Sequence, residues 1–296
     1  HYSIPPGFLQ KPWRDTVVNK WKYYNSAIVS DNEPRIPVIG KVDHRALFAQ
    51  YKSAYFIKYI TRFDLPEETE WWYCIKDDVF RIEDLKSKRR NVVKKGLDNF
   101  ITQIIDPNLY IDGFFEIIKT SLLEYNHDIK INREDIVQKC AYLSEDESSI
   151  IIGSFFREEP EKLAGYLWLK RNGNCLNLVE QHVIPDYEKF QINAALICFA
   201  CDYMNDEIAV GAYLSDGERN ILHQTAFQDY LEKYFGFRKA YCDLKILYRF
   251  YIKVFVWLLF PFRNCIDNYC KSHDISVLKK INSVLFLEKI RRSFNE

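Results

Sequence analysis

Two long apolar runs on either side of an Asn-Gly turn constrain the fold of this chain most strongly. The run LAGYLWLK at 163–170 is followed by RNGN at 171–174 and then by CLNLVEQHVI at 175–184. Asn-Gly supplies the left-handed residues of a tight hairpin turn, and both runs are rich in strand-forming residues. The pattern predicts an antiparallel hairpin, with SIIIGSFF at 149–156 as a third strand.

Helices and strands alternate after the hairpin. We expect a buried, almost wholly apolar helix at 192–204, a strand at 208–214, a helix at 218–235 and a last strand at 240–248. Ser215 and Asp216 are suitable N-caps for the second helix. Gly236 ends it in a left-handed turn, which costs other residues roughly 1 kcal/mol more. The order predicts an α/β fold with a mixed, mostly antiparallel sheet flanked by helices.

The earlier part of the chain is less regular. Proline and glycine punctuate the first 60 residues, with a helix expected near 43–56 and a strand at 70–75. Apolar periodicity then predicts helices at 82–100, 112–125 and 133–142. We therefore expect four regions: an N-terminal partial lobe at 1–80, a helical connecting region at 81–148, an α/β domain at 149–250 and a helical tail at 251–296.

Charge and cysteine content exclude some classes of protein. The 41 Lys and Arg residues balance 41 Asp and Glu, so no global charge favours nucleic acid. No secretory signal is expected, and eight scattered cysteines indicate reduced thiols in the cytoplasm.

Cys198 and Cys201 form a CxxC inside the apolar helix. Together with Cys265, Cys270 and His273, this pair could in principle bind zinc, but the spacing matches no compact zinc motif. We therefore expect Cys198 and Cys201 to be core thiols and expect no bound metal.

The corner EKYFGFRKAYCDL, between the last helix and the last strand, resembles the GNAT acyltransferase superfamily. HVIPDYEKFQINAAL resembles the strand end and helix that hold the acyl donor. LKSKRRNVVKKGL, followed by DGFFEIIKTSLLEYN, resembles the Fem-type branch, the aminoacyl transferases of cell-wall synthesis. The resemblance covers residues 70–248 and implies acyl-CoA or aminoacyl-tRNA as co-substrate. It implies donor contacts at Val183, Phe190, Gln191, Ile192 and Asn193.

One segment departs from the GNAT pattern. Members that use coenzyme A have a glycine-containing loop whose backbone N–H groups approach the diphosphate at a helix N-terminus. Here that loop contains Glu188 and no glycine. A carboxylate disfavours a diphosphate at the same place. An aminoacyl-tRNA donor tolerates this change, and so does a non-catalytic module.

Glu180 and His182 are the candidate pair for deprotonating an amine. Alternation along the strand places both on one face and Gln181, a candidate substrate contact, on the other. A solvated edge strand is the alternative explanation of the pair. Tyr248 at the end of the last strand is the candidate acid for the leaving group, or else a core tyrosine.

Basic residues before the α/β domain are candidate contacts for an anionic substrate. Lys88, Arg89 and Arg90 could grip phosphate on a tRNA or a lipid-linked precursor, although a charged helix face is often only solvated. His223 is either a further substrate contact or a surface histidine.

The tail combines apolar and basic segments. VFVWLLFPF at 254–262 falls short of the roughly 20 residues that span a membrane. With the basic residues near the C-terminus, it predicts either peripheral contact with the inner membrane face or a helix packed on the domain.

These features predict an acyltransferase that moves an acyl or aminoacyl group onto an amine of a cell-envelope or polysaccharide precursor. The carbonyl would be held where two strands part beyond Ala164. The alternative is a non-catalytic binding or scaffold module that docks to a membrane or a protein partner.

Overall fold

The computed structural model describes residues 19–125, 131–221, 226–273 and 275–294. Its strands are β1 Trp21–Tyr24, β2 Ala27–Ser30, β3 Phe56–Ile60, β4 Trp72–Lys76, β5 Phe100–Ile104, β6 Ser149–Phe156, β7 Leu163–Asn172, β8 Cys175–Val183, β9 Tyr213–Glu218, β10 Arg238–Tyr241 and β11 Leu244–Tyr248. Its α-helices are α1 His44–Gln50, α2 Ser87–Asn99, α3 Ile111–Tyr125, α4 Arg133–Glu145, α5 Ile192–Ile208, α6 Ala226–Phe235, α7 Phe250–Leu259, α8 Arg263–Ser272 and α9 Ser276–Ser293. Short 3₁₀ turns are η1 Ile82–Asp84, η2 Pro107–Tyr110, η3 Pro185–Phe190 and η4 Phe260–Phe262.

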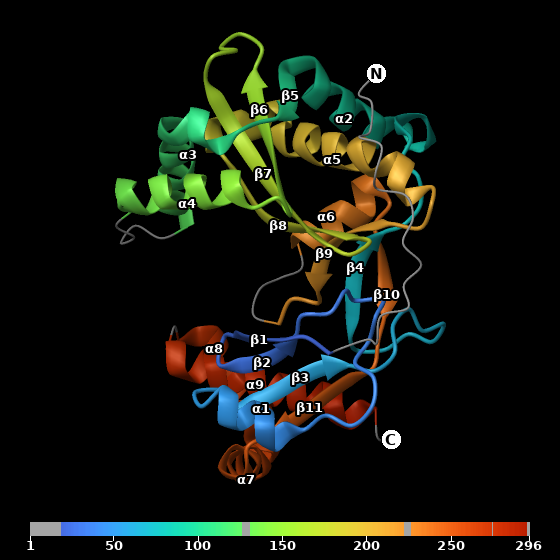
Figure 1. The fold of residues 1–296 in the computed structure, drawn as a ribbon, viewed down its shortest axis with the longest axis vertical. Helices are drawn as coiled ribbons and strands as arrows, with labels where there is room; N and C mark the ends of the chain where they lie inside the picture. Colours follow the sequence, from blue (N-terminus) through green and yellow to red (C-terminus); the bar gives the residue numbers. More distant parts are fainter. Residues whose placement is uncertain (1–18, 126–130, 222–225, 274, 295–296) are drawn as a thin grey trace.

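The strands of the described residues form two sheets (Figure 1). The larger has seven strands in the order β10-β4-β9-β8-β7-β6-β5, and the smaller has four in the order β1-β2-β3-β11. In the larger sheet β8 and β9 are parallel and the other neighbours are antiparallel. The predicted α/β class with a mixed, mostly antiparallel sheet is confirmed.

The central hairpin forms as the sequence predicts. β7 pairs with β8 from Gly165 opposite Val183 to Asn172 opposite Cys175. Gly173 occupies the turn with φ of +62°, a conformation that glycine adopts without steric cost. The Asn-Gly turn thereby sets the register of the strand that carries Glu180 and His182.

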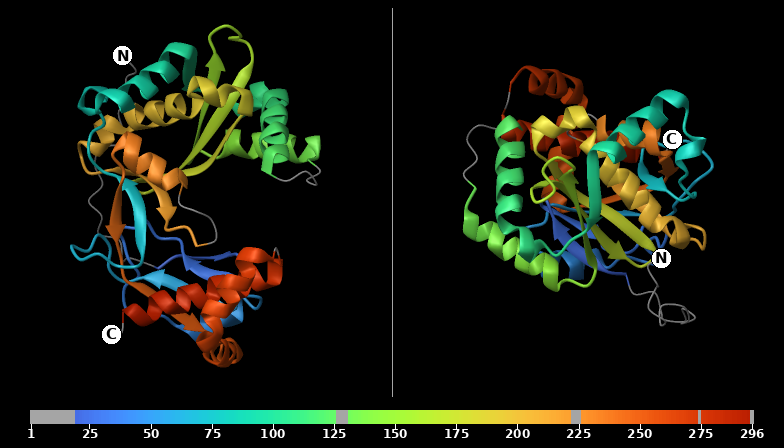
Figure 2. Two further views of the ribbon diagram at one scale, coloured as in Figure 1. Left: turned by 180° about the vertical axis from the view of Figure 1, so that it is seen from behind. Right: turned by 90° about the horizontal axis from the view of Figure 1, so that it is seen from above.

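Helices cover both faces of the larger sheet (Figure 2). α5 lies in one core with α2, and α3 and α4 pack on the opposite face. Gly96 permits the close approach of α2 to the start of α5, because a Cβ there would lie 2.6 Å from the Gln191 oxygen. On the other face the rings of Phe114 and Tyr166 stack with centroids 4.3 Å apart, which fixes α3 against β7.

The smaller sheet is also covered on both faces. Ile28 and Ile57 pack with Leu47 of α1. Their neighbours Ala27 and Phe56 point the other way and pack with Leu287 and Ile290 of α9, as alternation in a strand requires. α9 is therefore a packed helical tail.

The expected single strand at 240–248 is wrong. β10 ends at Tyr241 and pairs with β4 in the larger sheet, whereas β11 begins at Leu244 and pairs with β3 in the smaller one. The break follows from backbone bonds, because the Cys242 N–H donates to the Trp71 oxygen and the Asp243 N–H to the Arg62 oxygen. A run that alternates in sequence thus crosses from one sheet to the other.

The boundary between β9 and α6 also differs from the expectation. Ser215 and Asp216 lie within β9 and do not cap a helix, and α6 begins only at Ala226. The expected strand at 208–214 starts later, because α5 extends to Ile208 and β9 begins at Tyr213. The correction matters for the site, since it places the Asp216 carboxyl on a strand.

Gly96→Ala tests the contact between α2 and α5. Alanine in a helix interior is intrinsically better than glycine by about 1 kcal/mol. We nevertheless expect the substitution to lower the free energy of unfolding by about 1–3 kcal/mol, because the new methyl group overpacks the Gln191 backbone. Urea unfolding followed by circular dichroism measures the change, with the exposed Lys94→Ala in the same helix as control. A Gly96→Ala protein as stable as the wild type would contradict the close packing.

Candidate active site

β8 and β9 part after only three paired residues. The parallel ladder joins Cys175–Asn177 to Tyr213–Ser215 and extends no further, although β8 runs on to Val183. The backbone groups of β8 that face β9 therefore lack a strand partner beyond Asn177. The expected parting beyond Ala164 is corrected, because β7 and β8 stay paired to Val183. The gap lies one strand further along the sheet.

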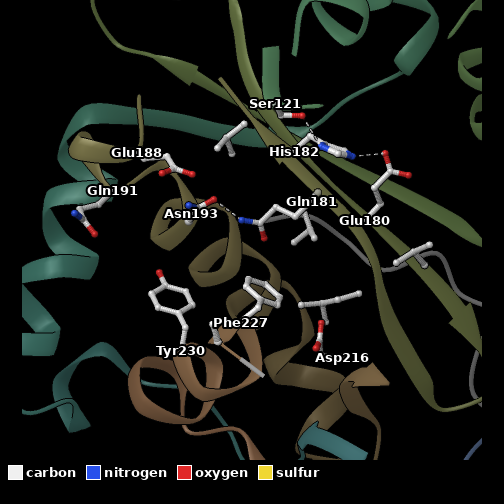
Figure 3. Close-up of a pocket in the computed structure, with 15 residues that line it drawn as sticks. Ser121, Glu180, Gln181, His182, Glu188, Gln191, Asn193, Asp216, Phe227 and Tyr230 are labelled. Carbon is white, nitrogen blue, oxygen red and sulfur yellow. Dashed lines mark hydrogen bonds and ion pairs between the residues drawn. The ribbon is translucent and has the colours of Figure 1, made fainter. Parts of the chain in front are cut away.

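A cavity of about 500 Å³ fills this gap. Leu178–Val183 of β8 form one wall, and Asp216 of β9 with Phe227 and Tyr230 of α6 form the other (Figure 3). Its volume falls within the range of small-molecule binding sites. The aromatic side chains line the cavity without closing it.

A β-bulge sits at the centre of the β8 wall. Trp168 pairs with Glu180 and Leu169 pairs with Leu178, so that Val179 is the additional residue. Bulges redirect side chains and are frequent beside active sites. Glu180 and His182 share one face of β8 beyond the bulge and point toward α3 and α4.

His182 links a hydroxyl and a carboxylate in this cavity. Its Nδ1 lies 2.7 Å from the Ser121 Oγ of α3, and its Nε2 lies 3.1 Å from the Glu180 Oε1. Lys139 Nζ and the Tyr166 hydroxyl each lie 2.5 Å from the same Glu180 oxygen. Glu180 and His182 therefore meet as the sequence predicts, inside a larger hydrogen-bonded group.

These donors determine the charge of Glu180. Burial alone would raise its pKa, but the hydrogen bond from His182 and the charge and hydrogen bonds of Lys139 and Tyr166 lower the pKa to about 2. Glu180 is therefore an ionised carboxylate near neutral pH. It is too weak a base to deprotonate an amine, and its geometry suits the orientation of His182.

Gln181 points to the opposite face of β8. Its Nε2 donates to Asn193 Oδ1 at 2.6 Å, which ties the strand to the first turn of α5. Its Oε1 is buried and has no hydrogen-bond partner among the described residues. Gln181, Asn193, Val183 and Gln191 all line the cavity, so four of the predicted substrate or donor contacts come together there.

Asp216 faces β8 from the other side of the gap (Figure 3). Burial raises its pKa to about 7, and a hydrogen bond with Gln228 partly opposes the shift. A carboxyl group with this pKa can take up and release a proton near neutral pH. Sequence reasoning missed this role, because Asp216 resembled a helix N-cap.

Other predicted site residues lie elsewhere. Phe190 packs on Phe156 and Ile192 is fully buried in the core. Tyr248 is on β11 of the smaller sheet, where it packs against Phe56. It is not near His182, because the chain changes sheets after Tyr241. His223 lies outside the described residues.

The basic cluster stands on α2, away from the cavity lining. Arg90 donates to the backbone oxygens of Glu83 and Leu85, which gives it a structural role, and Lys88 is exposed. Among the described residues no Lys or Arg lines the cavity, whereas Glu180, Glu188 and Asp216 do.

The cysteine pattern stays in the core. Cys198 and Cys201 are buried within α5, and burial raises the pKa of Cys198 to about 12. The described part of the chain contains no group of three or more His, Cys, Asp or Glu side chains placed to hold a metal ion.

Several solved structures have a similar fold. FemX is 11% identical, with a TM-score of 0.47 over 75% of this chain and 81% of its own. L-PGS from Bacillus licheniformis is 12% identical, with a TM-score of 0.45 over 75% of this chain and 79% of its own. The PaiA N-acetyltransferase of Thermoplasma acidophilum, in complex with coenzyme A, is 15% identical, with a TM-score of 0.30 over 36% of this chain and 73% of its own.

No family model matches the sequence, and no curated protein matches it either. The fold itself is GNAT-like, because α5 connects two parallel strands that part at the centre of an otherwise antiparallel sheet. The GNAT-like fold that the sequence resemblance implies is therefore confirmed.

Asp216→Asn tests the environment of this carboxyl through stability. The folded-state pKa of about 7 exceeds the unfolded value of about 3.9. The wild type therefore loses stability as pH rises from about 4 to 7, whereas asparagine does not titrate. We expect the variant to gain up to about 4 kcal/mol in unfolding free energy at pH 8 and nothing below pH 4.

The measurement is urea unfolding across this pH range. Asp98→Asn, at an exposed position of α2, should show no such pH-dependent difference from the wild type. A constant offset between Asp216→Asn and the wild type at all pH values would contradict the raised pKa.

Proposed function

We propose that this protein is an acyltransferase that moves an aminoacyl group onto an amine of a cell-envelope precursor. The observation that carries the proposal is the cavity where β8 and β9 part, bordered by a free strand edge and by Asp216. An open cavity at this position favours an enzyme over the alternative of a non-catalytic module.

The free edge of β8 suits the acyl carbonyl. Attack on a carbonyl places negative charge on its oxygen, and backbone N–H groups stabilise that charge when they point at it. Within the described part of the chain, the β8 backbone beyond Asn177 has no strand partner on the β9 side. A carbonyl oxygen lying along this edge would accept hydrogen bonds from the β8 backbone N–H groups that do not pair with β9.

Asp216 is the proposed base for the amine. An alkylamine has a pKa near 10.4 in water and must lose a proton before it attacks. A carboxyl with a pKa of about 7 is ionised above that pH and can accept the proton within the cavity. Activity is therefore expected to be lost as pH falls through about 7.

The charge of the cavity favours an aminoacyl donor over acyl-CoA. A diphosphate requires cations or helix N–H groups, and no Lys or Arg among the described residues lines the cavity. The α-ammonium of an aminoacyl group would instead be attracted by Glu188, Asp216 and the unpartnered Gln181 oxygen. Lys88 and Arg89 on α2 would meet the phosphates of a tRNA donor.

Kinetics of Asp216→Asn test this assignment. With aminoacyl-tRNA as donor and an amine-bearing precursor as acceptor, we expect kcat/KM to fall about 100-fold at pH 8. The wild-type pH profile should rise through about pH 7, and this rise should disappear in the variant. Asp98→Asn provides the control. Wild-type activity in Asp216→Asn would remove Asp216 from the mechanism, and turnover only with acyl-CoA would refute the donor assignment.

α7 supplies a reason to expect a membrane-bound acceptor. It lies at the end of the molecule opposite α2 and α5 (Figure 1). Its outer face carries exposed apolar side chains at Phe250, Tyr251, Val254, Phe255, Trp257 and Leu258, continued by Phe262 of η4. None of the described helices is both long and apolar enough to cross a bilayer.

The α7 face also carries an exposed cation. Lys253 is the one charged residue of α7 and is exposed, whereas Arg249 just before the helix donates to backbone oxygens of α1 and the turn after it. Aromatic residues beside basic ones favour the interface of a membrane with anionic lipids. We propose that α7 lies on such a surface and brings the enzyme to lipid-linked acceptors.

Sedimentation with vesicles of phosphatidylglycerol and phosphatidylcholine tests this surface. The double variant Phe250→Ser with Trp257→Ser should bind at least about 100-fold more weakly, because each lost apolar contact contributes about 1.5–3 kcal/mol. Leu109→Ser with Val210→Ser removes similarly exposed apolar side chains from other surfaces and should bind as the wild type does. Equal binding by both variants would contradict the proposal, as would concentration-dependent dimerisation through α7 without vesicle binding.

A further inference from the structure

Ser121, His182 and Glu180 form a continuous hydrogen-bonded line in the cavity (Figure 3). Ser121 Oγ lies 2.7 Å from His182 Nδ1, and His182 Nε2 lies 3.1 Å from Glu180 Oε1. A hydroxyl, an imidazole and a carboxylate in this order constitute the arrangement that activates a serine nucleophile. Nothing in the sequence pattern indicated Ser121.

The contacts determine which nitrogen of His182 carries the proton. Glu180 is ionised and can only accept hydrogen bonds, so the facing Nε2 must donate. The neutral ring then has its lone pair on Nδ1, which accepts the hydrogen of Ser121 Oγ. Ser121 also lies 3.3 Å from the Ile118 oxygen, but the shorter contact is to His182.

The three groups stand on rigid elements. Glu180 and His182 are two residues apart on β8, where pairing with β7 fixes them. Lys139 of α4 and Tyr166 of β7 hold the Glu180 carboxylate from the side. Phe114, stacked on Tyr166, secures the helix that carries Ser121. Such support from neighbouring side chains is what a catalytic geometry requires.

The cavity reaches the hydroxyl. Ser121 is only 6% exposed, yet it lines the same cavity as His182, Gln181 and Asp216. At about 500 Å³ the cavity falls within the range of small-ligand sites, so an acyl group can enter beside the hydroxyl.

We propose that Ser121 is a catalytic nucleophile that carries the acyl group between donor and acceptor. The inference rests on the proposed acyl transfer and adds a covalent intermediate to it. The protein would release the first product before the amine binds.

In the first half-reaction Ser121 Oγ attacks the carbonyl carbon of the donor ester while its proton moves to His182 Nδ1. The bond from Oγ to carbon forms, the ester C–O bond breaks, and the leaving oxygen takes the proton from Nδ1. In the second half-reaction the amine nitrogen attacks the acyl-serine carbonyl. As the N–C bond forms, the amine nitrogen, already deprotonated from ammonium to amine by Asp216, loses a second proton to His182 Nδ1. The C–Oγ bond then breaks and His182 Nδ1 gives that proton to Oγ. Glu180 stabilises the imidazolium present between these steps.

A fluorophosphonate probe tests this nucleophile without knowledge of the donor. We expect the folded 296-residue protein to gain one adduct per chain by intact mass, and peptide mapping should locate it on Ser121. His182→Ala should slow labelling at least 100-fold, because unactivated serine hydroxyls are poor nucleophiles. Thr120→Ala changes the neighbouring hydroxyl of α3, which bonds to the Glu116 oxygen, and should be labelled like the wild type.

The outcomes separate this inference from the proposed function. No adduct on Ser121 in the folded wild type, under conditions that label trypsin completely, would overturn the nucleophile. Labelling that His182→Ala leaves unchanged would also overturn it. Because adduct formation on Ser121 is measured on the wild-type protein, misfolding of a variant does not affect this test.

Transfer assays complete the comparison. The intermediate predicts ping-pong kinetics, with parallel lines in double-reciprocal plots, and loss of at least 100-fold activity in Ser121→Ala. Intersecting lines with near-normal transfer by Ser121→Ala would refute the intermediate and leave an acyltransferase of direct transfer. No transfer by the wild type with any aminoacyl donor, despite labelling of Ser121, would refute the proposed function alone.

Discussion

The parting of β8 from β9 is the constraint on which the site depends. Two parallel strands in a sheet normally continue to exchange backbone hydrogen bonds, yet here pairing stops at Asn177 and Ser215. β8 continues as a strand beyond that point, with the bulge at Val179, because β7 pairs with its other edge to Val183. β8 is therefore held in the sheet by β7 along one edge, while its other edge faces the cavity. The strand can bind a ligand along that free edge without losing the pairing that stabilises it.

The cavity divides into two chemical environments along the faces of β8. On the side of α3 and α4, His182 and the ionised Glu180 belong to a hydrogen-bonded group that is already satisfied. On the side of α5 and α6, Asp216 has a pKa raised by burial, and the Gln181 side-chain oxygen has no hydrogen-bond partner among the residues that the structure describes. The side with His182 and Glu180 is thus preorganised by its own hydrogen bonds. The side with Asp216 and Gln181 can accept hydrogen bonds from a ligand. A reaction in which the donor and the acceptor bind one after the other is consistent with these two environments.

Local patterns predicted most elements of the larger sheet. Alternation and an Asn-Gly turn identified the hairpin, and the same alternation correctly put Glu180 and His182 on one face. Local patterns failed where tertiary bonds decide the structure. The run at 240–248 alternates throughout, but bonds from Cys242 and Asp243 to distant backbone oxygens split it between two sheets. Ser121 and Lys139 join the site over 61 and 41 residues of sequence separation, which no periodicity reveals.

Hydrogen exchange measured by mass spectrometry tests the central claim most directly. A non-hydrolysable aminoacyl-adenosine amide would represent the end of a charged tRNA. The account predicts that this ligand slows exchange in peptides covering Leu178–Val183 and Asp216–Glu218, because its groups occupy the free edge of β8 and the facing strand. Protection confined to α2 or to the smaller sheet, with these two segments unchanged, would contradict the assignment of the gap between β8 and β9 as the active site.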